Sequence, residues 1–140
     1  MQNYKNHRQI VFTYHILTVL GMLALLIGSI INLVHSSEDN LYSASLLVLV
    51  SVLIPSAAMH ARRFALKVQD RAIRAEENLR YFILTGKRLD ARLTLGQIIA
   101  LRFASDEEFP TLAKRAVEEN LSNDAIKKQI RNWRPDTYRV

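Results

Sequence analysis

Two stretches without Asp, Glu, Lys or Arg decide the fold: Ile10–Val34, IVFTYHILTVLGMLALLIGSIINLV, and Leu41–Met59, LYSASLLVLVSVLIPSAAM. At a rise of 1.5 Å per residue, a helix of about 20 apolar residues crosses the hydrocarbon core of a bilayer. The first stretch has 25 residues and the second has 19, so each is long enough. They predict an all-α membrane protein built on a two-helix transmembrane hairpin.

The charged residues are segregated along the chain. Between Arg8 and Arg62 the only charged side chains are Glu38 and Asp39, which excludes an ordinary soluble domain although 49% of the 140 residues are apolar and only 23% are charged. The predicted parts are a cytoplasmic segment 1–9, transmembrane helix 10–34, outward loop 35–40, transmembrane helix 41–60, a cytoplasmic extension of that helix at 61–85, and a cytoplasmic helical subdomain at 86–140.

Lys and Arg set the predicted orientation. Lys5 and Arg8 precede the first stretch, the loop has neither type, and a basic segment follows the second stretch, comprising Arg62, Arg63, Lys67, Arg71 and Arg74. Because cytoplasmic flanks carry the excess of Lys and Arg, both termini are predicted to be cytoplasmic. The first apolar run exceeds the length of a signal-peptide core and lacks an A-x-A-like site, so it is expected to stay in the protein.

Small residues form a stripe on each predicted membrane helix. The first helix carries Gly21, Ala24, Gly28 and Asn32 near helical spacing, and the second carries Ala44, Ser51, Pro55 and Ala58. Close approach of helices in lipid depends on small residues and hydrogen bonds, so the two stripes are predicted to face each other. The alternative is that they form a contact between copies of the chain.

An apolar stripe continues beyond the membrane. Its members recur at spacings of three and four in a segment free of Gly and Pro, and they are Ala65, Val68, Ala72, Ala75, Leu79 and Phe82. The second helix is therefore predicted to run to Thr85, with Gly86 as its C-cap. This apolar stripe is expected to receive the C-terminal helices of the same chain. A partner chain is the alternative.

Three shorter helices are predicted in the remainder. Thr94 and Gln97 have capping-box spacing before a helix that ends near Ala104. A second helix begins either after Ser105, through the same spacing to Glu108, or at Pro110. A third opens at Ser122 and is ended by Pro135; its predicted inner face is Ile126, Ile130 and Trp133.

Several strings resemble a family of small bacterial integral membrane proteins catalogued as a domain of unknown function. They cover most of the chain and are Gln2–His7, Glu77–Phe82, Arg92–Gln97, Ala100–Phe103, Ile126–Lys128 and Trp133–Asp136 with Tyr138–Val140. The resemblance implies a multi-pass protein of the bacterial inner membrane. It implies no catalytic residues, because that family has none assigned.

The sequence offers little chemistry. There is no cysteine, and no nucleotide-binding, zinc-protease, hydrolase or EF-hand motif occurs. His15 and His60 are both predicted near the cytoplasmic face, where the pair could hold a haem or a metal as a redox subunit. The spans have no charged residue to couple ions, although the two-helix topology and the glycine stripe leave a homo-oligomeric channel as a further alternative.

The function predicted from the sequence is a non-catalytic accessory or scaffold subunit without a cofactor. The basic segment is expected to bind anionic lipid headgroups, where each basic residue contributes about 1 kcal/mol. Nucleic acid is disfavoured because no groove-reading motif accompanies these residues. The expected partners are the bilayer and either another protein or further copies of this chain.

Overall fold

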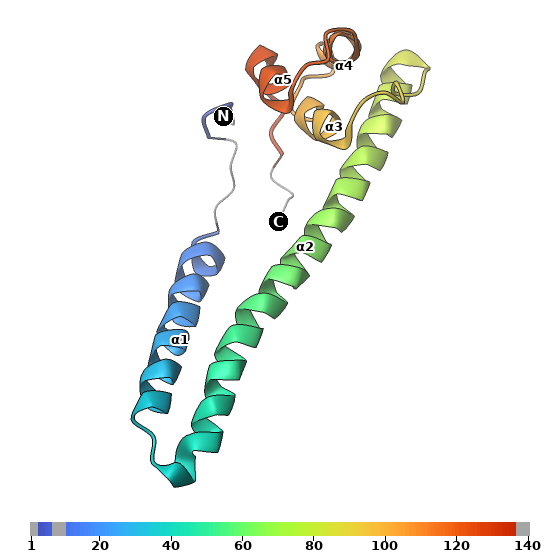
Figure 1. Ribbon diagram of the computed structural model, residues 1–140. Helices are drawn as coiled ribbons and strands as arrows, with labels where there is room; N and C mark the ends of the chain where they lie inside the picture. Colours follow the sequence, from blue (N-terminus) through green and yellow to red (C-terminus); the bar gives the residue numbers. More distant parts are fainter. Residues whose placement is uncertain (1–2, 7–10, 137–140) are drawn as a thin grey trace. The chain divides into compact units, whose positions relative to one another are not determined.

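The computed structural model describes residues 3–6 and 11–136, with only the backbone of Tyr14 (Figure 1). Over these residues the chain is all-α, as predicted, and its only strand-like pairing is an isolated bridge between Ala104 and Trp133. Internal contacts divide the chain into two units, residues 10–64 and residues 1–9 with 65–140.

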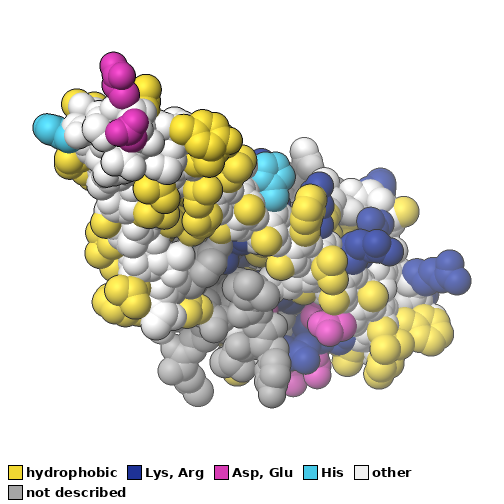
Figure 2. Space-filling view, turned by 90° about the horizontal axis from the view of Figure 1, so that it is seen from below, with side chains coloured by type: hydrophobic (Ala, Val, Ile, Leu, Met, Phe, Trp, Pro, Cys, Tyr) yellow, Lys and Arg dark blue, Asp and Glu magenta, His cyan; other side chains and the backbone are white. Residues whose placement is uncertain are grey.

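The first unit is a helical hairpin. It contains a π-helical turn at Thr13–Thr18, helix α1 at Val19–Val34, a 3-10 turn at Glu38–Asn40 and the first part of α2, which spans Leu41–Thr85. Two helical segments, His15–Val34 and Glu38–Thr85, are long and apolar enough to cross a membrane. Figure 2 shows the apolar side chains on the hairpin surface, with acidic groups at its loop end. Arg8, which contributes to the predicted orientation, lies outside the described residues.

Helix α2 ends where the sequence predicts. Its last residue is Thr85, and Gly86 follows with a φ of 70°, which favours glycine because it has no Cβ. The Gly86 amide donates to the carbonyl of Phe82 at 2.8 Å, so the last turn closes on the glycine.

The second unit adds three short helices, α3 at Leu95–Leu101, α4 at Phe109–Glu118 and α5 at Asn123–Gln129. The predicted capping box of Thr94 and Gln97 is present in full. Ser122 caps α5 as predicted by accepting from the Ala125 amide. The Ser105 alternative for α4 is wrong, because α4 begins beside Pro110 without a side-chain cap. The prediction for the end of α5 is also wrong: the backbone becomes extended at Ile130, well before Pro135.

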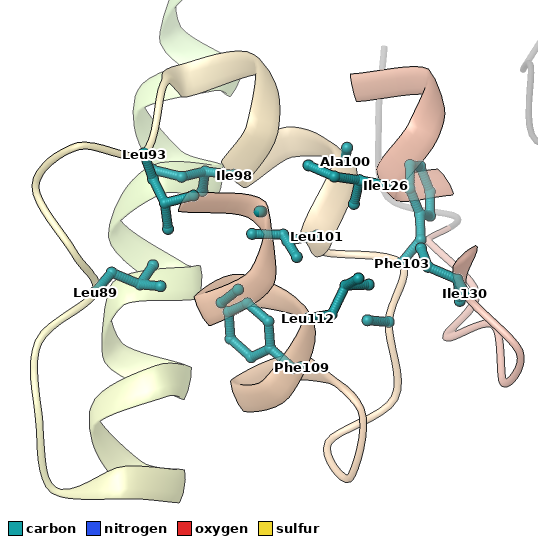
Figure 3. Packing of buried hydrophobic residues seen from close by; sticks show 13 residues of the cluster. Leu89, Leu93, Ile98, Ala100, Leu101, Phe103, Phe109, Leu112, Ile126 and Ile130 are labelled. Carbon is teal, nitrogen blue, oxygen red and sulfur yellow. The ribbon is translucent and has the colours of Figure 1, made fainter. Parts of the chain in front are cut away.

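The hydrophobic core of the second unit comes from the short helices and the loop that precedes them. Figure 3 shows its side chains converging between α3, α4 and α5. Tyr81 of α2 packs against this core, and its ring meets that of Phe109 edge-on at 5.6 Å. The buried members are Leu89, Leu93, Ile98, Ala100, Leu101, Phe103, Ala104, Phe109, Leu112, Ala113, Ala116, Ile126 and Ile130.

The expectation that the C-terminal helices cover the apolar stripe of α2 is wrong. Its large members Val68, Leu79 and Phe82 are 67%, 61% and 52% exposed. The three alanines of the stripe are exposed as well. The buried positions in this part of α2 are instead Ile73 and Glu77, which lie on a different face of the helix. The pattern identified a real stripe, but the rest of the second unit packs on the opposite side of the helix.

Candidate functional site

The buried face of α2 carries an ionic cluster rather than an apolar seam. Glu77 is 5% exposed. Arg80, one turn further along α2, donates from Nη1 to Oε2 of Glu77 at 3.0 Å. The i, i+3 spacing on a helix places these two side chains side by side. We call Glu77, Arg80, Asp106 and Arg134 the charged node.

Arg80 connects α2 to the loop before α4. Its Nε donates to Oδ1 of Asp106 at 2.7 Å, and its Nη2 donates to the carbonyl of Ala104 at 2.7 Å. Its guanidinium also lies 4.6 Å from the centre of the Phe109 ring. Together with the bond to Glu77, all three nitrogens of the planar guanidinium donate to different acceptors, an arrangement that lysine could not reproduce.

Arg134 brings the C-terminal segment to the same cluster. Its amide donates to the carbonyl of Phe103 at 2.8 Å, and its Nη1 lies 3.9 Å from Oε1 of Glu77. Nearby, Nε of Arg102 lies 3.1 Å from Oδ2 of Asp136. A small cavity of about 140 Å³ is lined by Ile73, Glu76, Glu77, Arg102, Arg134, Pro135 and Asp136.

The charges of the charged node hold segments of the second unit together. Burial raises the pKa of the Glu77 carboxyl above its ordinary value, while Arg80 and Arg134 beside it favour the charged form. The carboxylate is thus held between guanidinium groups from two segments far apart in sequence. Sequence reasoning missed this cluster. The available signal was the Glu77 and Arg80 spacing on the same face as Ile73.

In the hairpin, α1 and α2 meet through serines. The hydroxyl of Ser29 donates to that of Ser51 at 3.2 Å, and the two residues are 5% and 1% exposed. Ala44 is 1% exposed, and Pro55 and Ala58 are half-buried. The structure therefore places the small residues predicted on α2 along its less exposed face.

The small residues predicted on α1 lie elsewhere. Gly21, Ala24, Gly28 and Asn32 are exposed, and a Cβ added at either glycine would meet nothing within 4 Å. Within one chain the two predicted stripes are therefore not face to face. Ser29 lies on the side of α1 that contacts α2, where the serine pair supplies a buried hydrogen bond.

His15 and His60 each contact their own helix. Nδ1 of His15 lies 3.0 Å from the carbonyl of Val11, and Nδ1 of His60 lies 2.8 Å from that of Ser56. His35, at the loop, makes the same contact with Ile31 at 2.9 Å. A contact that three histidines share does not distinguish a cofactor ligand, so the haem or metal hypothesis stays a prediction. No group of three or more His, Asp or Glu side chains in the described part of the chain is placed to hold a metal ion.

The basic segment lies along α2. Arg63, Lys67, Arg71 and Arg74 are exposed, and Arg62 is half-buried. None of the four exposed side chains forms an ion pair with another residue that the structure describes. Their charge is therefore available to a ligand outside the chain.

Comparison with known families places the whole chain in one of them. A family model described as a family of unknown function, DUF6526, matches residues 1–140. The chain belongs to the DUF6526 family. No curated protein and no solved structure matches it. Membership of DUF6526 names no activity.

Proposed function

We propose that this DUF6526 chain is a non-catalytic integral membrane subunit whose α1 and first half of α2 cross a bilayer. One observation carries the proposal. Only 6% of the apolar window in His15–Val34 and 11% of that in Glu38–Thr85 is buried within the chain. The core helix of a soluble protein hides its apolar side chains from water, and these helices do not. A bilayer supplies the missing apolar surroundings.

The flanking charges favour cytoplasmic termini. Lys and Arg lie before the first helix and after the second, and the connecting loop has Glu38 and Asp39 instead. For a bacterial cell we infer an inner-membrane protein with the loop outside. The exposed side chains of Arg63 and Lys67 then lie within reach of anionic headgroups.

A binding role suits the rest of the molecule. In the charged node the buried carboxylate and guanidinium groups contact one another. These contacts hold the C-terminal segment and the loop before α4 against α2. The apolar stripe remains exposed on another face of α2. Contiguous exposed apolar surface of this kind marks interaction sites in proteins. We therefore assign the chain an accessory or scaffold role.

Membrane insertion and orientation are tested together. The chain has no cysteine, so single cysteines report topology without background. Ser37→Cys in the loop should react with a membrane-impermeant maleimide in intact spheroplasts, and Ser122→Cys at the start of α5 should react only after permeabilisation. Resistance of the full chain to extraction by alkaline carbonate should accompany this pattern. Release by carbonate, or labelling of Ser122→Cys alone, would overturn the proposal.

The accessory role needs a second experiment. The full chain is purified from native membranes in a gentle detergent, and the mass of the protein component is measured by light scattering. We expect a complex heavier than the 16.1 kDa monomer. A monodisperse monomer under these conditions would contradict a scaffold function.

A further inference from the structure

The apolar stripe of α2 has the heptad spacing of a coiled coil, and the chain itself leaves it uncovered. From Ala65 to Phe82 its six members alternate between the two seam positions of a heptad over about 27 Å of helix. We propose that the stripe is the interface of a parallel homodimer, in which it packs against the same stripe of a second copy.

Flanking charges select this partner and this direction. Arg71 directly precedes the seam residue Ala72, and Glu76 directly follows the seam residue Ala75, so they occupy the g and e positions of the heptad. In a parallel pair, a g residue faces the e residue five positions further along the other helix. Arg71 therefore faces Glu76 of the second copy, and the twofold symmetry makes this pair twice.

Neither charge is satisfied within the described chain. Arg71 and Glu76 are exposed, and neither forms an ion pair with any residue that the structure describes. Five residues apart on one helix, they lie on opposite flanks of the stripe and do not face each other. A second copy supplies the opposite charge to both.

An antiparallel pair would not satisfy these charges. In that arrangement g positions face g positions and e positions face e positions. Arg71 would then face no acid and Glu76 no base, because the flanking residues from 64 to 83 are Phe64, Arg71 and Asn78 at g and Gln69, Glu76 and Ile83 at e. Two copies inserted in one bilayer share the same direction, so the parallel arrangement rests on the proposed membrane insertion.

The stripe combines small and large apolar residues. Ala72 and Ala75 lie at the middle of the seam, where their small side chains let two helices approach closely, and Ala65 does the same at its start. Val68, Leu79 and Phe82 are more than half exposed and supply the apolar surface that a dimer would bury. In Figure 2, apolar side chains also lie among the Lys and Arg side chains of the visible face.

Cysteine cross-linking in native membranes tests the interface. A parallel seam places each seam residue opposite its own copy, so Ala72→Cys and Ala75→Cys should each give a disulfide-linked dimer on oxidation. Arg74→Cys, on the same helix but away from the stripe, should stay monomeric under the same conditions. Equal cross-linking at all three positions, none at Ala72 and Ala75, or a cross-link to a protein of another mass would overturn the proposal.

Charge reversal tests the direction. Arg71→Glu or Glu76→Arg, each in the Ala75→Cys background, should lower the dimer yield about fivefold, the size expected when two exposed ion pairs per dimer are lost. The double variant Arg71→Glu with Glu76→Arg should restore it, and Arg74→Glu should leave it unchanged. Failure of the double variant to restore the yield would overturn the parallel pairing. Carbonate extraction of every variant separates the two proposals: release from the membrane contradicts insertion, and retention without cross-linking contradicts the dimer.

Discussion

Arg80 donates from Nη1 to Oε2 of Glu77 at 3.0 Å, and the two side chains are only 11% and 7% exposed. The pair stands on the face of α2 that contacts the C-terminal segment, which also brings Arg134 to the same carboxylate. A buried ion pair contributes little net stability over apolar residues, but it is costly to break because one charge is then left buried. Because of this asymmetry, removal of one partner of the pair should measurably lower the stability of the second unit.

Removal of the Glu77 carboxylate should destabilise the second unit. We expect Glu77→Ala to lower the free energy of unfolding by about 3 kcal/mol, because Arg80 stays buried with fewer partners. The measurement is urea unfolding of the full chain in detergent, followed by the fluorescence of Trp133, the only tryptophan, which packs against Phe103. Glu118→Ala removes an exposed carboxylate and should change stability by less than about 0.5 kcal/mol. Equal effects of the two variants would contradict this account.

The raised pKa of Glu77 predicts a pH dependence. The folded chain binds the proton on Glu77 more tightly than the unfolded chain, whose carboxyl has its ordinary pKa of 4.5. The resulting stabilisation is fully present below pH 4.5 and is lost as the pH rises through the raised folded-state value. The stability of the wild type relative to Glu77→Gln should therefore fall with rising pH in this window. If this difference in stability stayed constant or rose with pH, the effect of Arg80 and Arg134 on the pKa of Glu77 would exceed that of burial.

Gln97 joins helix capping to packing between helices. Its Oε1 accepts from the Thr94 amide at 2.8 Å, and its Nε2 donates to the carbonyls of Ala116 and Leu121 at 3.3 and 2.9 Å. Gln97→Ala should cost about 2–3 kcal/mol, because the Thr94 amide and the carbonyl of Leu121 lose this partner and a buried side chain is removed. Thr94→Ala, which loses only the cap, should cost about 1 kcal/mol.

A third variant separates the two functions of Gln97. Gln97→Glu keeps the acceptor of the capping box but turns a carboxylate toward two carbonyl oxygens, so it should destabilise the unit at least as much as Gln97→Ala. The same urea titration measures all three variants. Wild-type stability of Gln97→Glu would show that the two bonds to Ala116 and Leu121 are unimportant.

The serine contact in the hairpin should be open to disulfide formation. Because the hydroxyls of Ser29 and Ser51 are 3.2 Å apart, the double variant Ser29→Cys with Ser51→Cys should form a disulfide within one chain on mild oxidation. The measurement is loss of maleimide labelling in an unfolded sample. Gly28→Cys with Ser51→Cys is the matched control and should remain labelled, because the exposed Gly28 faces open space. The reverse result would restore the predicted glycine stripe as the contact between the helices.

Local features of the second unit were predictable because their causes are local. The capping box of Thr94 and Gln97, the Ser122 cap and the Gly86 terminus each depend on groups within a few residues, and each was confirmed. The charged node was not predictable in this way, since Glu77 and Asp106 come from segments 29 positions apart. No periodicity in the sequence connects them.

The sequence by itself determined that two long apolar helices form, where α2 ends and that three short helices follow. Only the tertiary structure decided which face of each long helix is covered. Periodicity states which residues share a face, but burial depends on what packs there. On α1 the contact with α2 is made through the serine pair, and Gly21 and Gly28 stay exposed. On α2 the side that carries Arg80 and Tyr81 packs against the rest of the second unit, and the stripe from Ala65 to Phe82 stays exposed.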